Sequence, residues 1–218
     1  MTTTSQATLG HLALHYRPGD YERAHHLFEA LGAHLEHNGP QGFFSIVFDR
    51  DGWNYVDNVM YLAQAGPVLL GLEDAVVEGL RAGTADEDPR LAAFREQRAS
   101  FPEALDHFGI RYESFDALER AVLALQTATA PGGALEGRAT VTRYRARAGQ
   151  DPRIDAAMDA SPIFGDHDDD GTSRADYGVQ VFVKTDVCAA GLFAFGQTIE
   201  LDYFWEPAFA TMPDFGRR

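Results

Sequence analysis

The chain has 218 residues, of which 45% are hydrophobic, and its formal net charge is −15. That composition is typical of a folded protein with an apolar core, and the negative charge argues against nucleic acid and against an anionic membrane surface as partners. Cys188 is the single cysteine, which excludes an intramolecular disulfide and a thiolate-rich metal site. We expect a cytoplasmic protein, because the chain lacks a signal-peptide pattern and an apolar run near the ~20 residues of a membrane span.

Two segments of the chain, 11–20 and 107–116, share one pattern. Each begins with a histidine, and each has an apolar residue three positions later, a tyrosine five positions later and an aspartate nine positions later. A stretch with helical periodicity follows both segments. An internal repeat of this kind predicts two copies of one structural unit.

The first copy predicts a strand over 11–16, where apolar and mixed residues alternate. Asp20 is a suitable N-cap for a helix that ends at Gly32. Three strand-like runs follow at 33–37, 43–48 and 58–64, separated by turn residues. The predicted order is strand, helix and three strands.

The second copy repeats this order from His107 onward. Asp116 is predicted to begin the helix, with Glu119 in the position of a capping-box acid. The strand-like runs that follow are 139–147, 179–184 with an extension toward 195, and 197–205.

Two segments lie outside the repeat. The first, 71–104, has helical patterns over 72–80 and 89–98 and is predicted to connect the two copies. The second, 149–176, is rich in Asp and Gly, and its carboxylates do not have the spacing of an EF-hand loop. We interpret this insertion as a solvated loop, with Ca²⁺ binding as the alternative.

The last predicted strand carries carboxylates on one face. Glu200 and Asp202 alternate with apolar residues, and a carboxylate within an apolar strand is costly to bury unless it is paired or binds a metal. His11 and His107 each begin a predicted strand. Two imidazoles and one carboxylate form the triad that holds Fe(II) or Mn(II) with open coordination positions. The alternative is a metal-free cleft in which Glu200 pairs with Arg111.

The repeat resembles the vicinal oxygen chelate superfamily, which includes glyoxalase I, bleomycin-resistance proteins and type I extradiol dioxygenases. The segments that carry the resemblance are 11–16, 28–32, 107–112 and 199–203. The resemblance implies an α+β fold in which two paired βαβββ modules form an open, cup-shaped mixed sheet. We therefore expect a single domain over 1–218, in which the resemblance covers module 1 at about 8–66 and module 2 at about 105–206. The connector at about 71–104 and the acidic insertion at about 149–176 lie outside the resemblance.

The same resemblance implies metal ligands on the first and fourth strands of each module. These fall on His11, His107 and Glu200, and Met60 falls where a fourth ligand would lie. A thioether is a poor ligand for a hard metal, so the pattern resembles the three-ligand dioxygenases. The implied function is a metal-dependent enzyme for a small substrate whose vicinal oxygens chelate the metal. The alternatives are a glyoxalase-type isomerase or lyase and a metal-free sequestering protein of the bleomycin-resistance type. Whether the chain forms a homodimer is left open.

Proton transfer needs a further group, because the middle strands of module 2 lack the His and Tyr that dioxygenases place there. His15 is predicted to be the base, since it shares the face of His11 and a neutral imidazole can act as a general base. Arg111 holds the matching position in module 2 and is predicted to bind an anionic substrate group, together with Asp202.

Overall fold

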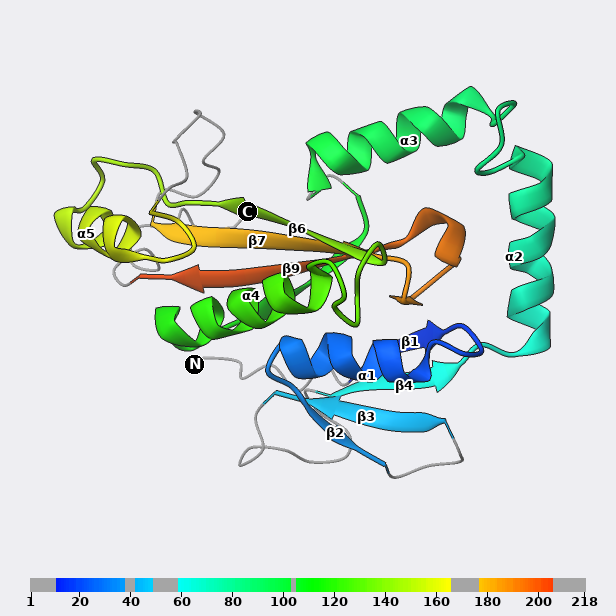
Figure 1. Cartoon of the computed structure of the whole chain (residues 1–218), viewed down its shortest axis with the longest axis horizontal. Coiled ribbons are helices and arrows are strands. Elements are labelled where there is room, and N and C mark those ends of the chain that lie inside the picture. The colour runs from blue at the N-terminus through cyan, green and yellow to red at the C-terminus, as the bar shows by residue number, and fades with distance from the viewer. Residues whose placement is uncertain (1–10, 38–41, 49–58, 103–104, 166–176, 206–218) are drawn as a thin grey trace, which may run out of the picture.

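The protein is an α+β fold built on two open, mixed β-sheets, which confirms the α+β class that the sequence predicts (Figure 1). The computed structural model describes residues 11–37, 42–48, 59–102, 105–165 and 177–205. The strands are β1 (His11–Tyr16), β2 (His34–Glu36), β3 (Phe43–Val47), β4 (Val59–Gln64), β5 (His107–Arg111), β6 (Ala139–Tyr144), β7 (Gly178–Thr185), β8 (Cys188–Ala189) and β9 (Gln197–Phe204). The helices are α1 (Tyr21–Ala30), α2 (Pro67–Leu80), α3 (Pro89–Ser100), α4 (Phe115–Thr129) and α5 (Pro152–Ala160), with a short 3₁₀ helix η2 (Phe193–Phe195).

The two sheets share one connectivity. In the first, the strand order is β2-β3-β4-β1-β8, and β1 runs parallel to β4. In the second, the order is β5-β9-β7-β6, and β5 runs parallel to β9. Thus β1 and β5, which carry the repeated pattern, hold the same place in their sheets, and each is followed by a helix.

One apolar core joins the two halves. Leu27 and Phe28 of α1 and Leu118 and Val122 of α4 are fully buried in the same cluster as the apolar faces of both sheets. Leu27 lies three positions after the buried Ala24, and Val122 lies four positions after Leu118, spacings that place these residues on one face of each helix. A hydrogen bond also crosses between the halves, because the Tyr112 hydroxyl donates to the Leu31 carbonyl at 2.7 Å.

The acidic residues at the helix starts act differently from the sequence prediction. Asp20 occupies the N-cap of α1, but its side chain makes no capping hydrogen bond. Helix α4 begins two residues earlier than predicted, with Ser114 as the N-cap in place of Asp116 and its side chain accepting from the Ala117 amide. Glu119 accepts a hydrogen bond from the Ser161 hydroxyl instead of closing a capping box.

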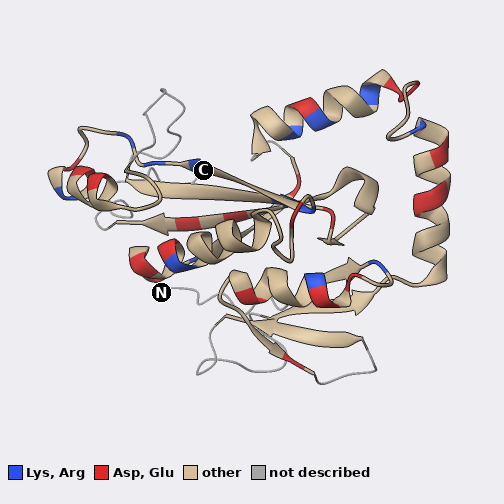
Figure 2. Cartoon of the chain, in the orientation of Figure 1, with Lys and Arg blue, Asp and Glu red and all other residues tan. Residues whose placement is uncertain are grey.

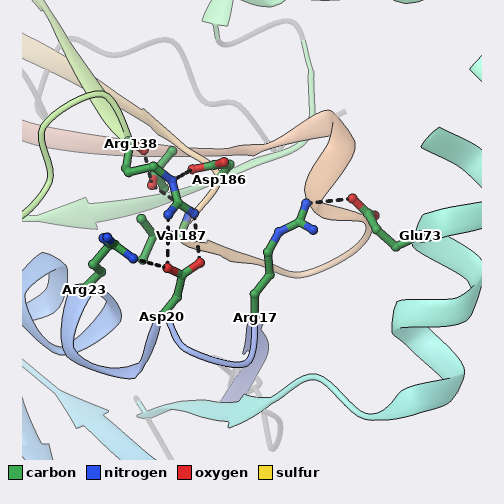
Figure 3. A network of polar contacts seen from close by, with 8 residues as sticks. Arg17, Asp20, Arg23, Glu73, Arg138, Asp186 and Val187 are labelled. Carbon is green, nitrogen blue, oxygen red and sulfur yellow. Dashed lines mark hydrogen bonds and ion pairs between the residues drawn. The ribbon is translucent and has the colours of Figure 1, made fainter. Parts of the chain in front are cut away.

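Asp20 instead belongs to an ion-pair network between the halves (Figure 3). Arg138, at the start of the second sheet's outer strand, donates to both oxygens of Asp20 at 3.0 and 2.8 Å and to Asp186 at 2.8 Å. Arg23 donates to Asp20 at 2.7 Å. Burial opposes ionisation of Asp20, but the hydrogen bonds from Arg138 and Arg23 outweigh it and lower the pKa of Asp20.

The two segments outside the repeat differ in how well they were predicted. The connector forms α2 and α3, as expected, and Figure 1 shows both helices at one side of the molecule, away from most of the sheet surface. The insertion was interpreted as a loop, but its first part is the helix α5, capped by Asp151. Its acidic run at 166–171 lies outside the described residues. Across the described ranges, no helix has the length and apolar character that crossing a bilayer demands.

Candidate functional site

Strand register gathers polar side chains on one face of the second sheet. Gly109 pairs with Glu200 and Arg111 pairs with Asp202 across the parallel β5–β9 ladder, and His107 lies two residues before Gly109. Figure 2 shows the resulting acidic segments on β9, within a sheet that otherwise has few charged residues. The opposite face of these strands is apolar and packs in the core.

His107 and Glu200 are in direct contact. The imidazole Nε2 lies 2.9 Å from a Glu200 carboxylate oxygen, and Nδ1 lies 2.8 Å from the Leu105 carbonyl oxygen. A carbonyl oxygen only accepts, so Nδ1 carries a proton and donates it to Leu105. Nε2 is therefore directed at Glu200, in the orientation that a metal-binding imidazole adopts when its other nitrogen is fixed by a carbonyl.

Glu200 is held from a second strand as well. It is 8% exposed, and its other carboxylate oxygen accepts a hydrogen bond from the Gln180 amide. Gln180, which was not predicted as a site residue from the sequence, lies on β7, and β7 pairs antiparallel with β9. Its one recognisable feature is that it is the polar exception in an apolar run between Val179 and Val181.

Asp202 is the most strongly perturbed carboxyl group of the site. Burial, reinforced by the neighbouring charge of Glu200 and a hydrogen bond to it, raises the pKa of Asp202 to about 8, while Arg111 acts in the opposite direction. One Asp202 carboxyl oxygen is buried without a hydrogen-bond partner among the described residues. A titratable pair with such a shift marks a candidate functional site.

His11 does not lie in this cluster. It lines a cavity of about 1060 Å³, which also borders Leu12 and Met60 of the first sheet and Arg111 and Tyr112 of the second half. The cavity therefore lies between the β1 and β5 ends of the two sheets. Of the predicted substrate-binding residues, Arg111 reaches this cavity and also faces Asp202.

The neighbour of His11 explains why His11 does not contact a carboxylate as His107 does. Its ring packs against the Tyr61 ring, with centroids 5.1 Å apart. In the β1–β4 register, Tyr61 pairs with the residue two after His11, just as Glu200 pairs with the residue two after His107. Tyr61, not Met60, is thus the first-sheet counterpart of Glu200, and the predicted alignment was wrong by one residue.

His15 occupies a half-buried position beside β8. It pairs with Ala189 in the strand register, and its Nδ1 is buried with no hydrogen-bond partner among the described residues. It is absent from the residues that line the cavity between the sheets. Its assignment as a base therefore stays a prediction.

The donor set fits a divalent metal in part. His107 and Glu200 present a nitrogen and an oxygen at one point, whereas His11 lies in the cavity between the sheets. Within the ranges that the structure describes, no group of three or more His, Cys, Asp or Glu side chains is arranged to hold a metal ion. The structure thus brings together two of the three predicted ligands.

Comparisons with known proteins do not narrow the assignment. No family profile, no curated protein and no solved structure matches this chain. Function must accordingly be argued from the site itself.

Proposed function

We propose that this chain is a metal-dependent enzyme of the vicinal oxygen chelate type, with His107 and Glu200 as ligands of Fe(II) or Mn(II). The observation that carries the proposal is the His107–Glu200 contact, in which the Leu105 carbonyl orients the imidazole and Gln180 orients the carboxylate. Orientation of ligands by such neighbours is characteristic of metal sites. The shared connectivity of the two sheets supports paired βαβββ modules within one domain.

A metal at this position supplies a Lewis acid and a template for a small substrate with vicinal oxygens. The protein's own groups supply the rest. Arg111 attracts an anionic oxygen of the substrate, and Asp202 holds a proton next to Glu200 at neutral pH. His15 is the proposed base, so His15→Ala lowers kcat without changing metal content. A glyoxalase-type isomerase or lyase uses the same groups, and the proposal includes it as the alternative reaction.

A second function is a metal-free protein that sequesters a small ligand. It is favoured by the separation of His11 from the His107–Glu200 pair and by the cavity of about 1060 Å³ between the sheets. That cavity combines apolar walls with charged groups such as Arg111, Arg120 and Glu113. Sites of this composition are typical of small-molecule binding.

Metal titration of the full chain separates the two functions. Near-stoichiometric binding of Fe(II) or Mn(II), measured anaerobically by calorimetry and elemental analysis, supports the enzyme. His107→Ala and Glu200→Gln are expected to weaken binding by more than ~100-fold, and Gln180→Leu by ~10-fold, since even residues that only orient a ligand matter this much. His34→Ala, at an exposed position on β2, is the control.

His11→Ala tests the ligand set. Unchanged metal affinity assigns the site to the second sheet alone, whereas a loss comparable to that of His107→Ala restores His11 as a ligand. A folded wild-type chain that binds neither metal refutes the enzyme proposal and leaves sequestration.

A further inference from the structure

A second cavity, of about 480 Å³, lies between the connector helices and the end of the second sheet. It is far richer in cationic groups than the chain as a whole. Its charged lining residues are Arg17, Glu73, Arg95, Arg98, Arg138, Lys184 and Asp186. In a chain with a formal net charge of −15, a cavity with five basic and two acidic side chains is unusual.

Three of the five basic side chains are already neutralised. Arg17 donates to Glu73 at 2.8 Å, as Figure 3 shows, and lies over the Phe193 ring. Arg138 is paired with Asp20 and Asp186 in the network between the halves. Arg95 forms an ion pair with Glu87.

Arg98 is not neutralised in this way. It is only 6% exposed, and its Nε and one terminal nitrogen are buried without a hydrogen-bond partner among the described residues. Its ion pair with Asp106 is long, at 3.4 Å, and the Asp106 side chain is 80% exposed. Leaving N–H groups of a buried guanidinium unsatisfied is costly, so such donors call for an explanation.

Lys184 adds a second positive charge beside Arg98. Its ammonium donates to the Ala99 carbonyl, not to a carboxylate, at 3.1 Å. Burial, reinforced by repulsion from Arg98, lowers the pKa of Lys184. The two cations therefore create a local excess of positive charge that a bound anion relieves.

Glu73 contributes the complementary feature. One of its oxygens is occupied by Arg17, and the other is buried without a partner among the described residues. A phosphate group has acceptor oxygens for the cations and, as the hydrogen phosphate dianion or a singly protonated monoester, one P–OH donor for this oxygen. A sulfate lacks that donor.

We propose that this cavity binds a phosphate group, free or as a small monoester, through Arg98 and Lys184, with Glu73 accepting the phosphate proton. The planar guanidinium suits two oxygens at once, and the ammonium adds a point charge. This site is separate from His107 and Glu200 and does not depend on metal binding there.

Calorimetric titration of the full chain with inorganic phosphate, at constant ionic strength set by chloride, tests the proposal. We expect phosphate to bind at least ~10-fold more tightly than sulfate, because one charged hydrogen bond distinguishes them. A parallel titration with glycerol 3-phosphate distinguishes the sources, since tighter binding of the ester identifies an organic phosphate as the ligand and tighter binding of the free ion identifies phosphate itself.

Substitutions in the cavity provide the second criterion. Arg98→Gln is expected to weaken phosphate binding ~10-fold or more, and Lys184→Gln about three- to fivefold. Arg90→Gln is the matched control, because Arg90 lies on the same helix with an 85% exposed side chain. If Arg98→Gln does not fold, the phosphate affinity of Lys184→Gln decides whether the proposal holds. Phosphate binding no tighter than that of chloride or sulfate, or equal binding by the wild type and the folded cavity variants, overturns the proposal.

Discussion

His11 and His107 hold equivalent places at the starts of β1 and β5, yet their neighbours give them different chemistry. The residue two positions after each histidine pairs with a residue on the neighbouring parallel strand. That partner is Tyr61 in the first sheet and Glu200 in the second. Next to Tyr61, the His11 imidazole packs on an aromatic ring. Next to Glu200, His107 contacts a carboxylate. The side chain on the neighbouring parallel strand thus determines whether the histidine lines a cavity or belongs to a charged site.

At the residue scale, Asp202→Asn is expected to change how stability depends on pH. The folded wild type keeps the Asp202 proton up to a pKa of about 8, whereas the unfolded chain releases it near pH ~4. The folded state therefore binds more protons across this window, and the free energy of unfolding falls as pH rises through it. Asparagine carries no titrating proton and removes this slope.

Chemical denaturation from pH 4 to pH 9 measures the effect. The Asp202→Asn variant should be more stable than the wild type by ~1–3 kcal/mol at pH 9, less than the full ~1.4 kcal/mol per pKa unit because the carboxyl group is partly exposed. The two proteins should converge near pH 4. Asp86→Asn, at an exposed turn position, is the control and should leave the slope unchanged. Parallel curves for Asp202→Asn and the wild type would contradict the assignment.

At the element scale, the strands and helices that have a regular apolar pattern and clear boundary residues were predicted correctly. The strands at 11–16 and 43–48 and the helix after Asp20 were placed within a residue or two, because each has a periodic apolar face and a clear boundary. The contact between His107 and Glu200 was also predictable, since both lie on the polar faces of their strands. The helix α5 was not, because its short apolar face lies within a run of aspartates and glycines.

The strand register could not be obtained from the sequence. A shift of one residue exchanges the faces of a strand, and nothing within 58–64 distinguishes Met60 from Tyr61 as the residue facing His11. Gln180 was missed for a related reason. Its link to Glu200 depends on which strands are neighbours in the second sheet, and that is a property of the folded chain.

Helix α4 offers an element-scale prediction. Ser114→Ala removes the side chain that accepts from the Ala117 amide, and is expected to lower the free energy of unfolding by ~1 kcal/mol. Ser114→Asp should retain stability, because aspartate caps as well and is favourable near a helix N-terminus. Thermal and urea unfolding of both variants checks this. A Ser114→Ala variant as stable as the wild type would show that the cap contributes little.

At the scale of the whole molecule, the halves are held by contacts between residues distant in sequence. Arg138 and Asp20 are 118 positions apart, and the Asp20 side chain is only 7% exposed. From the sequence, Asp20 was predicted to cap a helix, because a local motif accounts for an aspartate there and a pairing across the chain leaves no local pattern.

Arg138→Met is therefore expected to destabilise the protein by ~2–3 kcal/mol at pH 7, since it leaves a buried carboxylate with one partner fewer. The pKa of Asp20 is lowered in the folded state, so its stabilising contribution is present above pH ~4 and is lost as pH falls through the folded pKa. The cost of the substitution should accordingly shrink in acid.

The matched control is Arg153→Met, which removes an exposed pair with Asp151. That pair should contribute less than ~1 kcal/mol. Urea unfolding at pH 7 and pH 3 compares the two variants. If Arg138→Met costs no more than Arg153→Met, the network does not hold the halves together.

The position of β8 has a consequence for synthesis on the ribosome. β1 is the first described strand, but the residues that pair with its outer edge, Cys188 and Ala189, are synthesised long after it. β5 likewise waits for β9. Both nascent strands thus expose unpaired backbone edges until these later segments are made, and such edges invite pairing with other chains. The acidic composition opposes that encounter, because neighbouring nascent chains repel each other.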